Sequence, residues 1–249
     1  MDNWEFCANY ISMLATGSAT PITVLDYGCG AGQIVTRLRN KGIDAKGCDI
    51  FYAGGDYSKY VPSEMLGKII KPMENGVIPF PGESFNVVVN NQVLEHVEDI
   101  DSVLAEIHRV LMPHGKVLSL FPDKSVWREG HCGIPYLHWF PKGSKIRIYY
   151  AAFLRALGMG HFKGDKSILQ WSRDFCAWLD QWTWYRSDRE IRAAFDKYFV
   201  SLTHIEDSWL QERLGQQAAT IGWLPKQTRR WMVRKLAGLV FICTKAGRE

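Results

Sequence analysis

The sequence predicts an α/β fold built around a parallel sheet. Three observations lead to this prediction: strand-like and helix-like segments alternate over the first half, a glycine-rich turn directly follows the first apolar strand, and the same rhythm returns after residue 187. Strands that alternate with helices form βαβ units, whose crossovers are right-handed. A length of 249 residues allows one large domain, or one domain with an elaborate insertion.

The first half alternates apolar runs with segments of helical periodicity. Strands are expected at 22–28, 44–50, 84–91 and 116–122, and helices at 33–42 and 99–115. In the second of these helices the apolar residues recur with a period of 3.6, and Pro113 and Gly115 are expected to close it. The continuous β-branched run at 87–89 indicates a buried strand.

Residues 123–187 break this rhythm with many aromatic residues, prolines and glycines, followed by helical segments. The segment is longer than an ordinary connecting loop, so we expect a helical, aromatic-rich insertion that serves as a substrate lid. Its helix at 171–182 places four aromatic side chains on one stripe, which favours packing inside the lid: Trp171, Phe175, Trp178 and Trp182. A single domain over 1–249 is then completed by a helix at 188–199, a strand at 199–207, a helix at 208–215 and a strand at 236–246.

Composition places the chain among globular proteins and argues against several function classes. Hydrophobic residues make up 47% and charged residues 22%, and a net charge of +4 is too mild to predict nucleic-acid binding. The six cysteines form no CxxC pair and no Cys/His cluster with zinc spacing, so no metal is expected. The chain shows no signal-peptide pattern and no transmembrane-length apolar run. We therefore expect a reduced, cytoplasmic setting.

The stretch VLDYGCGAGQ places three glycines directly after a strand. Such glycines allow a tight turn and a close approach of backbone to ligand, although a turn made only for packing has the same pattern. The loop lacks the GxxxxGK[ST] pattern of ATP and GTP sites, and Gln33 stands where a dinucleotide-binding GxGxxG has its last glycine. Asp26 would repel a pyrophosphate but attract a cation, and Asp49, 21 residues after Gly28, suits both hydroxyls of a ribose. The pocket is thus predicted to bind an adenosine with a positively charged tail.

Three stretches of the chain match the pattern of one family: VLDYGCGAGQ, GCDI and IPFPGESFNVVVNNQVLEHVEDIDSVLAEIHRVLMPHGKVLSLFP. Through them, over roughly residues 20–122, the chain resembles the class I S-adenosylmethionine-dependent methyltransferases, in particular the broad methyltransferase-domain group with the pattern PF…SFD…EHV…RVLxPGG. The resemblance implies a Rossmann-like fold whose seven-stranded, mostly parallel sheet has an antiparallel last strand. It also implies S-adenosylmethionine as cofactor and S-adenosylhomocysteine as product. Asn86 replaces the Asp of SFD, and His114 replaces a Gly of PGG.

The resemblance also implies which residues bind the cofactor. Those near its methionine part would be Asp26 and the backbone of Gly28, Cys29 and Gly30. Asp49 would bind the ribose, with Ile50 against the adenine. The adenine edge would be reached by Glu74, where the family commonly has Asp, and by Asn75. The cofactor near its methyl group would be lined by Asn91 and Gln92.

Methyl transfer from a sulfonium is an in-line displacement, so the protein mainly aligns the reactants, and a hydroxyl acceptor also needs a base. Histidine is the natural base near neutral pH. His96 follows the strand at 84–91, and His131 and His138 lie at the start of the insertion, where it would overhang the carboxyl ends of the strands. We expect the catalytic base among these three, against the alternative that each makes only structural hydrogen bonds.

Two further stretches bear on the acceptor. EGHCGIPYLHWFP resembles, more loosely, methyltransferases of bacterial surface-glycan biosynthesis, which implies a sugar hydroxyl as the acceptor. KQTRRWMVRK, residues 226–235, carries five basic residues and no acidic one, so it is either a solvated basic face or a helix that contacts an anionic membrane surface. Membrane contact would favour a lipid or quinone-like acceptor. A cofactor-binding module that regulates a partner without catalysis is the alternative from another class.

Overall fold

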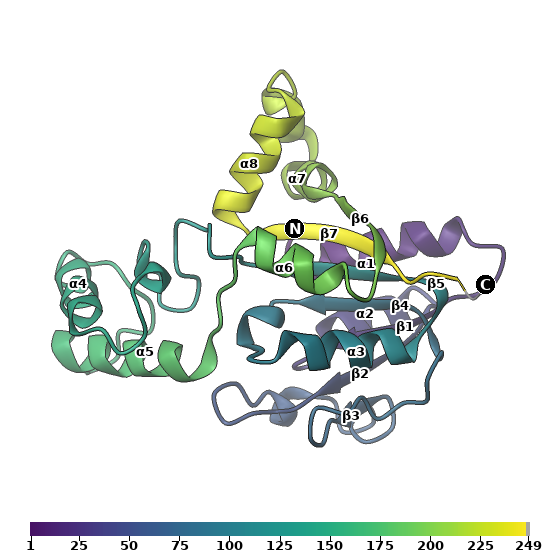
Figure 1. The fold of residues 1–249 in the computed structure, drawn as a ribbon, viewed down its shortest axis with the longest axis horizontal. Helices are drawn as coiled ribbons and strands as arrows, with labels where there is room; N and C mark the ends of the chain where they lie inside the picture. Colours follow the sequence, from purple (N-terminus) through teal and green to yellow (C-terminus); the bar gives the residue numbers. More distant parts are fainter. Residues whose placement is uncertain (248–249) are drawn as a thin grey trace.

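A computed structural model describes residues 1–247, and its centre is one seven-stranded sheet (Figure 1). The strands are β1 (Thr23–Tyr27), β2 (Asp44–Asp49), β3 (Ile70–Pro72), β4 (Phe85–Asn91), β5 (Leu111–Phe121), β6 (Val200–His204) and β7 (Leu239–Thr244). They lie in the order β3-β2-β1-β4-β5-β7-β6. Only β7 runs antiparallel to its neighbours β5 and β6, as expected for its position as the last strand.

Helices cover both faces of the sheet, because successive side chains of a strand point to opposite sides. Val88 packs into the core beneath α3 (Ile100–Val110) and α6 (Asp188–Phe195). Val87 and Val89 point to the other core, which is closed by α1 (Asn3–Thr16), α2 (Gln33–Asn40), α7 (Glu206–Leu214) and α8 (Lys226–Leu236). The β-branched run at 87–89 therefore serves two cores at once, which explains why it does not alternate with polar residues.

The prediction that Pro113 and Gly115 close the helix at 99–115 is wrong. The helix ends at Val110, and Leu111 already has extended backbone angles and begins β5. Leu111 is fully buried at the start of β5, and its position also fits the 3.6-residue period of the helix, so its apolar character could not reveal where the helix stops. Pro113 lies in the irregular stretch where the pairing of β4 and β5 shifts register, a place where a missing N–H is tolerated.

The other boundaries differ by smaller amounts. The strand expected at 199–207 ends at His204, and α7 begins at Glu206, two residues before the helix expected at 208–215. The N-terminal helix α1 and the short edge strand β3 were not placed from the sequence. Short 3-10 turns complete the described chain: η1 (Ser58–Tyr60), η2 (Leu94–His96), η3 (Leu137–Trp139) and η4 (Gly215–Ile221). Within residues 1–247 no helix is long and apolar enough to cross a membrane.

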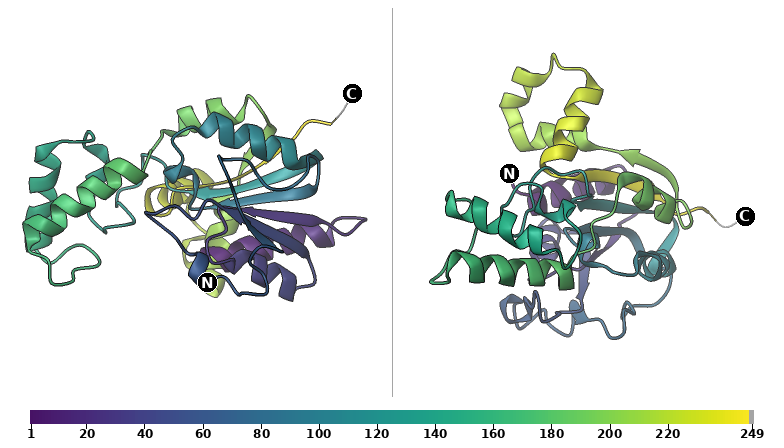
Figure 2. Two further views of the ribbon diagram at one scale, coloured as in Figure 1. Left: turned by 90° about the horizontal axis from the view of Figure 1, so that it is seen from below. Right: turned by 60° about the vertical axis from the view of Figure 1, so that its left-hand side comes forward.

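Residues 123–187 form a helical lobe between β5 and α6. Its helices α4 (Lys145–Ala156) and α5 (Ile168–Trp182) pack against each other. They project beyond the sheet at the carboxyl end of β5 (Figures 1 and 2). The lobe has a core of its own, which includes Trp171 fully buried and Phe175 and Trp178 partly buried. The ring of Trp182 instead lies 5.0 Å from that of Tyr52, in the loop after β2. Three of the four aromatic side chains of the stripe therefore pack in the lobe core, and Trp182 is the exception.

Gly238 lies in the connection between α8 and β7, where a substitution tests the close packing of the backbone. Its φ is +97°, and a Cβ there would lie 2.4 Å from the backbone oxygen of Phe121. Gly42 has φ +78° and open space around it, so it isolates the cost of the backbone conformation alone. We expect Gly42→Ala to lower the free energy of unfolding by about 1–2 kcal/mol, and Gly238→Ala to lower it by about 3 kcal/mol or more because the backbone must also shift. Urea denaturation measures the free energy of unfolding of both variants. Equal losses would contradict the close contact between position 238 and the backbone of Phe121.

Candidate active site

The glycine loop after β1 is folded tightly against the end of β2. The amides of Gly28 and Cys29 donate to the carbonyl oxygen of Cys48 at 2.8 and 3.1 Å. Gly28 has φ +71°, and a Cβ there would lie 2.4 Å from a methyl carbon of Val93. The amide of Gly30 donates to Oδ2 of Asp49 at 2.8 Å. Glycine is thus required at position 28, and the loop presents backbone rather than side chains to the space above it.

Two carboxyl groups lie beside this loop, at the ends of β1 and β2. Burial raises the pKa of Asp26 well above its usual range, and the neighbouring Asp49 raises it further. Burial also raises the pKa of Asp49, although hydrogen bonds from the amides of Phe51 and Gly30 oppose the rise. A cation placed between these groups would lower both pKa values, because it favours the charged form of each. The pair therefore suits a positively charged ligand.

The remaining predicted cofactor residues lie along the same edge of the sheet. Ile50 is 52% exposed after β2, and Glu74 and Asn75 are exposed in the turn that follows β3. Asn91 ends β4, and its buried side-chain oxygen has no hydrogen-bond partner among the described residues. Gln92 is exposed and has φ +58°. The unpaired oxygen of Asn91 fits a site completed by a ligand that donates hydrogen bonds.

The structure brings two of the three predicted histidines into contact at this edge. Nε2 of His131 lies 3.1 Å from Nε2 of His96. Nδ1 of His96 lies 2.7 Å from the carbonyl oxygen of Trp182, which can only accept, so Nδ1 carries the proton. Burial lowers the pKa of His96 to about 4, so the ring is neutral at pH 7 and its Nε2 holds a lone pair. Nε2 of His131 must therefore donate the hydrogen bond to His96.

Glu129 fixes the other side of His131. This carboxylate is fully buried and accepts hydrogen bonds from Nδ1 of His131 at 2.6 Å, the amide of Cys132 at 2.7 Å and the hydroxyl of Tyr185 at 2.7 Å. Burial alone would raise its pKa, but these bonds and the charge of His131 hold the pKa at about 2. Burial likewise opposes the charged form of His131, and Glu129 overcomes it and raises the pKa of that ring. His131 is thus an imidazolium paired with a buried carboxylate.

Glu95 lies immediately before His96 and is 2% exposed. Neither of its carboxyl oxygens has a hydrogen-bond partner among the described residues. Burial raises its pKa to about 7, although the charge of His131 acts in the opposite direction. An unpaired, buried carboxyl group with a pKa near neutrality is able to exchange a proton at physiological pH.

His138 is connected to Glu129 and His131 through Tyr185. It is 7% exposed, burial lowers its pKa to about 4, and its ring centroid lies 4.5 Å from that of Tyr185. Tyr185 in turn bonds Glu129. The aromatic rings next to His96 and His131 come from segments far apart in sequence: Tyr52 in the loop after β2 lies against His96, and Trp178 in α5 lies against both histidines. The ring of Trp182 packs against Tyr52.

Sequence reasoning missed Glu95, Glu129 and Tyr185. The two glutamates had a local signal, since Glu95 adjoins His96 and Glu129 stands two residues before His131. Within residues 1–247, no group of three or more His, Cys, Asp or Glu side chains is arranged to hold a metal ion.

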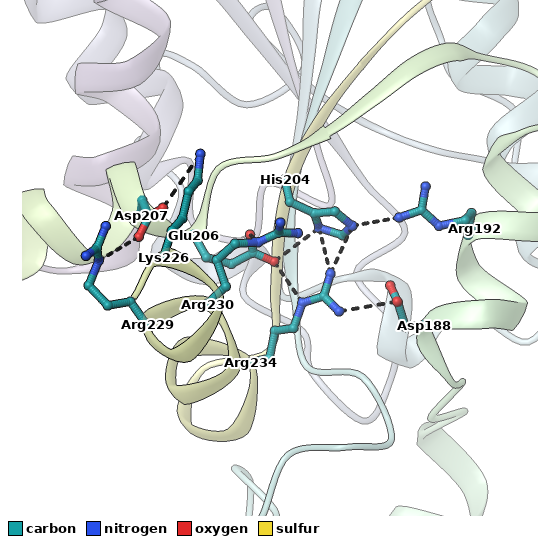
Figure 3. A network of polar contacts seen from close by, with 9 residues as sticks. All are labelled: Asp188, Arg192, His204, Glu206, Asp207, Lys226, Arg229, Arg230 and Arg234. Atoms are coloured by element: carbon teal, nitrogen blue, oxygen red, sulfur yellow. Dashed lines mark hydrogen bonds and ion pairs between the residues drawn. The ribbon is translucent and has the colours of Figure 1, made fainter. Parts of the chain in front are cut away.

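The basic residues of 226–235 lie on α8 and are paired within the molecule (Figure 3). Arg230 and Arg234 contact the fully buried carboxylate of Glu206 at 3.3 and 3.0 Å, and Arg234 also reaches Asp188. Asp207 pairs with the two cations nearest the start of the helix, Lys226 and Arg229. Much of the positive charge of α8 is thus balanced by carboxylates of α6 and α7, which weakens the case for electrostatic attraction to an anionic membrane.

Replacement of Glu129 tests the charge assignment without any activity assay. Glu129→Gln removes the carboxylate that raises the pKa of His131 and leaves the opposing effect of burial, so the pKa of His131 should fall. Titration of the ring protons by NMR measures it, with the signal assigned by its loss in His131→Asn. Glu98→Gln, a change at an exposed position, is the control and should leave the pKa unchanged. An unaltered pKa in Glu129→Gln would show that the ion pair does not form.

Comparisons with known proteins agree with this architecture. A family model described as "Methyltransferase domain" matches residues 2–198. A ubiquinone biosynthesis O-methyltransferase of Bartonella tribocorum is 26% identical over 151 residues, which is 59% of this chain and 60% of that protein. The chain therefore spans about three fifths of the length of this curated relative.

Solved structures share the fold at low sequence identity. An S-adenosylmethionine-dependent methyltransferase from Mesorhizobium loti superposes with a TM-score of 0.52 at 12% identity, covering 98% of this chain and all of that one. A phosphoethanolamine N-methyltransferase of Haemonchus contortus, solved with S-adenosyl-L-methionine, gives 0.51 at 15% identity over 97% of this chain and 52% of that one. The chain belongs to the methyltransferase-domain family, and the class I S-adenosylmethionine-dependent methyltransferase fold predicted from its sequence is confirmed.

Proposed function

We propose that the protein transfers a methyl group from S-adenosylmethionine to a hydroxyl oxygen of a small-molecule acceptor. The observation that carries this proposal is the position of Glu95, His96 and His131, which lie together at the sheet edge that also holds the glycine loop. A cofactor site and a proton-accepting site therefore share one crevice. The lobe of residues 123–187, which contributes His131 and Trp178 to this group, acts as the substrate lid.

The residues around the glycine loop fit the cofactor group by group. Asp49 already accepts two backbone hydrogen bonds, and its carboxylate has further lone pairs for the ribose hydroxyls. Asp26 and Asn91 supply a carboxylate and an unpaired amide oxygen for the ammonium and sulfonium end. The bound cofactor supplies an activated methyl group, and this chain aligns it with the acceptor.

The charges of the cluster decide which group takes the proton. His131 already carries two protons, and the lone pair of His96 is occupied by the hydrogen bond from His131. Glu95 has neither limitation, so we assign the base to Glu95 and give His131 the role of stabilising the negative charge that develops on the acceptor oxygen. His96 positions His131, and His138 packs behind Tyr185.

The walls of the site favour a flat, aromatic acceptor. The rings of Tyr52 and Trp178 lie against the two histidines, and the ring of Trp182 packs against Tyr52. A hydroxylated, quinone-like ring would pack against them over both faces, and the relative from Bartonella tribocorum is named for ubiquinone biosynthesis. A sugar hydroxyl is the second candidate, favoured by the sequence block at 129–141 and by the ability of tryptophan to stack on a sugar face.

Cofactor binding is tested with two aspartates of the same strand. Asp49→Ala removes the carboxylate at the carboxyl end of β2, whereas Asp44→Ala removes an exposed one at its start. We expect Asp49→Ala to weaken binding of S-adenosylhomocysteine by about tenfold to a hundredfold, the value of one or two charge-assisted hydrogen bonds. Calorimetric titration measures this affinity. Asp44→Ala should leave it unchanged, and equal affinities in both variants would refute the placement of the cofactor.

Glu95 and the acceptor class are tested by turnover. The rate of S-adenosylhomocysteine release should rise with pH through about 7, because Glu95 must be ionised to accept a proton. Glu95→Gln should lower kcat by about 10²–10⁴-fold and remove this pH dependence while retaining cofactor affinity. Catechols and simple glycosides are the two acceptor sets. Turnover of glycosides alone would establish the second candidate, and no turnover of either set with intact cofactor binding would support a regulatory module instead.

A further inference from the structure

An apolar cavity of about 440 Å³ lies between the start of the lobe and α8. One wall is formed by Trp127, Tyr136 and Trp139, and the other by Trp231, Met232 and Leu236. This volume falls within the range of ligand pockets, roughly 300–1,000 Å³. The α8 wall lies outside residues 2–198, the part of the chain that matches the family model.

The two walls are joined by hydrogen bonds between the loop and α8. The amide of Trp127 donates to the carbonyl oxygen of Lys235 at 3.0 Å, and Nζ of Lys235 donates to the carbonyl oxygen of Ser125 at 3.0 Å. Nε1 of Trp139 donates to the carbonyl oxygen of Lys124 at 2.7 Å. The polar groups at the joined walls are thus directed to backbone carbonyls, and most of the residues that line the cavity are aromatic or aliphatic.

The cavity and the candidate active site share one loop, residues 125–139. Residues 125–139 fold back on themselves, with the amide of Tyr136 donating to the carbonyl oxygen of Trp127 at 2.8 Å. This loop contributes Trp127, Tyr136 and Trp139 to the cavity, and it contributes Glu129 and His131 to the catalytic cluster. The rings of His138 and Trp139 are neighbours, with centroids 6.4 Å apart.

Charge and exposure identify the kind of occupant. Four of the five cations of α8 pair with Glu206, Asp207 and Asp188 (Figure 3), which reduces the attraction of the helix for an anionic headgroup or an acidic partner. Two apolar side chains nevertheless remain exposed beside the cavity: Trp231 at 60% and Leu236 at 66%. An uncharged hydrocarbon chain would cover this apolar surface without leaving a charge unpaired.

We propose that this cavity binds the hydrocarbon tail, acyl or prenyl, of the methyl acceptor whose hydroxylated head reaches the histidine cluster. The proposal rests on the function proposed above, since it assigns a tail to that acceptor. Binding of the tail would hold the head in place for transfer, so a tailed acceptor would be used at lower concentration than the same head alone.

The tail site is tested first by binding, which requires no turnover. The neutral probe N-phenyl-1-naphthylamine reports an apolar site by its fluorescence, and farnesol should displace it from the wild-type protein. Trp231→Asp places a carboxylate at an exposed position of the cavity wall, and we expect it to weaken farnesol binding by about tenfold or more. Trp223→Asp is the matched control, since Trp223 is 79% exposed and does not line the cavity. It should leave the affinity for farnesol unchanged.

Retained affinity for S-adenosylhomocysteine shows that each variant is folded, and Leu236→Asp, at a second exposed lining residue, should reproduce the effect of Trp231→Asp. With a farnesylated and an unmodified catechol, Trp231→Asp should raise KM for the first and leave both constants for the second unchanged. This arm separates the two proposals, because absence of methyl transfer would refute the function while farnesol binding still reports on the cavity.

Three results would overturn the tail site. The first is absence of farnesol binding to the wild-type protein, or equal loss in Trp231→Asp and Trp223→Asp. The second is loss of sedimentation with phosphatidylcholine vesicles in Trp231→Asp while its farnesol affinity is unchanged, which would mean that a bilayer covers the patch. The third is a dimer in sedimentation velocity that Trp231→Asp dissociates, which would mean that a second copy of the chain occupies it.

Discussion

The position of β1 between β2 and β4 is the constraint on which the site depends. The chain proceeds from β1 toward one edge of the sheet and from β4 toward the other, so the connections after these strands part and leave a crevice at their carboxyl ends. The glycine loop, Asp49 and Asn91 all lie at this crevice because they end neighbouring strands. The 3-10 turn with Glu95 and His96 follows β4 directly, so it lies at the same edge.

Burial of charge gives this crevice its chemistry. Breaking a buried ion pair typically costs about 3–5 kcal/mol, because the remaining charge stays desolvated. Glu129 avoids such a state through three donors, and it keeps His131 charged. The side chain of Glu95 is buried without a hydrogen-bond partner among the described residues, and the positive charge of His131 acts on it. The pKa of Glu95 therefore depends on the charge of His131. One fully paired carboxylate thus sets the charge of the residues around it.

The parts that would recognise the acceptor lie outside the seven-stranded sheet. The lobe has its own core, and the loop at its start reaches both the catalytic cluster and α8. The network in Figure 3 anchors α8 to α7 through Glu206, which contacts two arginines from full burial, and to α6 through Asp188, which contacts Arg234. Variation in elements outside the sheet changes the acceptor without disturbing the cofactor site, which is how one fold serves many reactions.

The sequence by itself determined the features that are local. Residues close together in the chain indicate the alternation of strands and helices and the glycine loop with Asp26 and Asp49. They also indicate the helices, because apolar residues that recur about every 3.6 positions mark the buried face of a helix. His114, with φ +60°, stands where the family pattern has glycine, so even this departure keeps the backbone conformation that the pattern implies. The end of α3 was not predicted, because an apolar residue at position 111 fits both the period of the helix and a buried strand.

Only the tertiary structure decided the features that join distant segments. Tyr185 reaches Glu129 across 56 residues, and His131 reaches His96 across 35, so no spacing rule in the sequence could pair them. The sequence predicted a solvated basic face or a membrane-contacting helix at 226–235. It could not show the carboxylate partners, because they lie on α6 and α7, far from this stretch in the chain. Electrostatic and apolar contacts act through space rather than along the chain, and for this reason the charge of His131, the pairing of α8 and the cavity at Trp231 became visible only in the folded molecule.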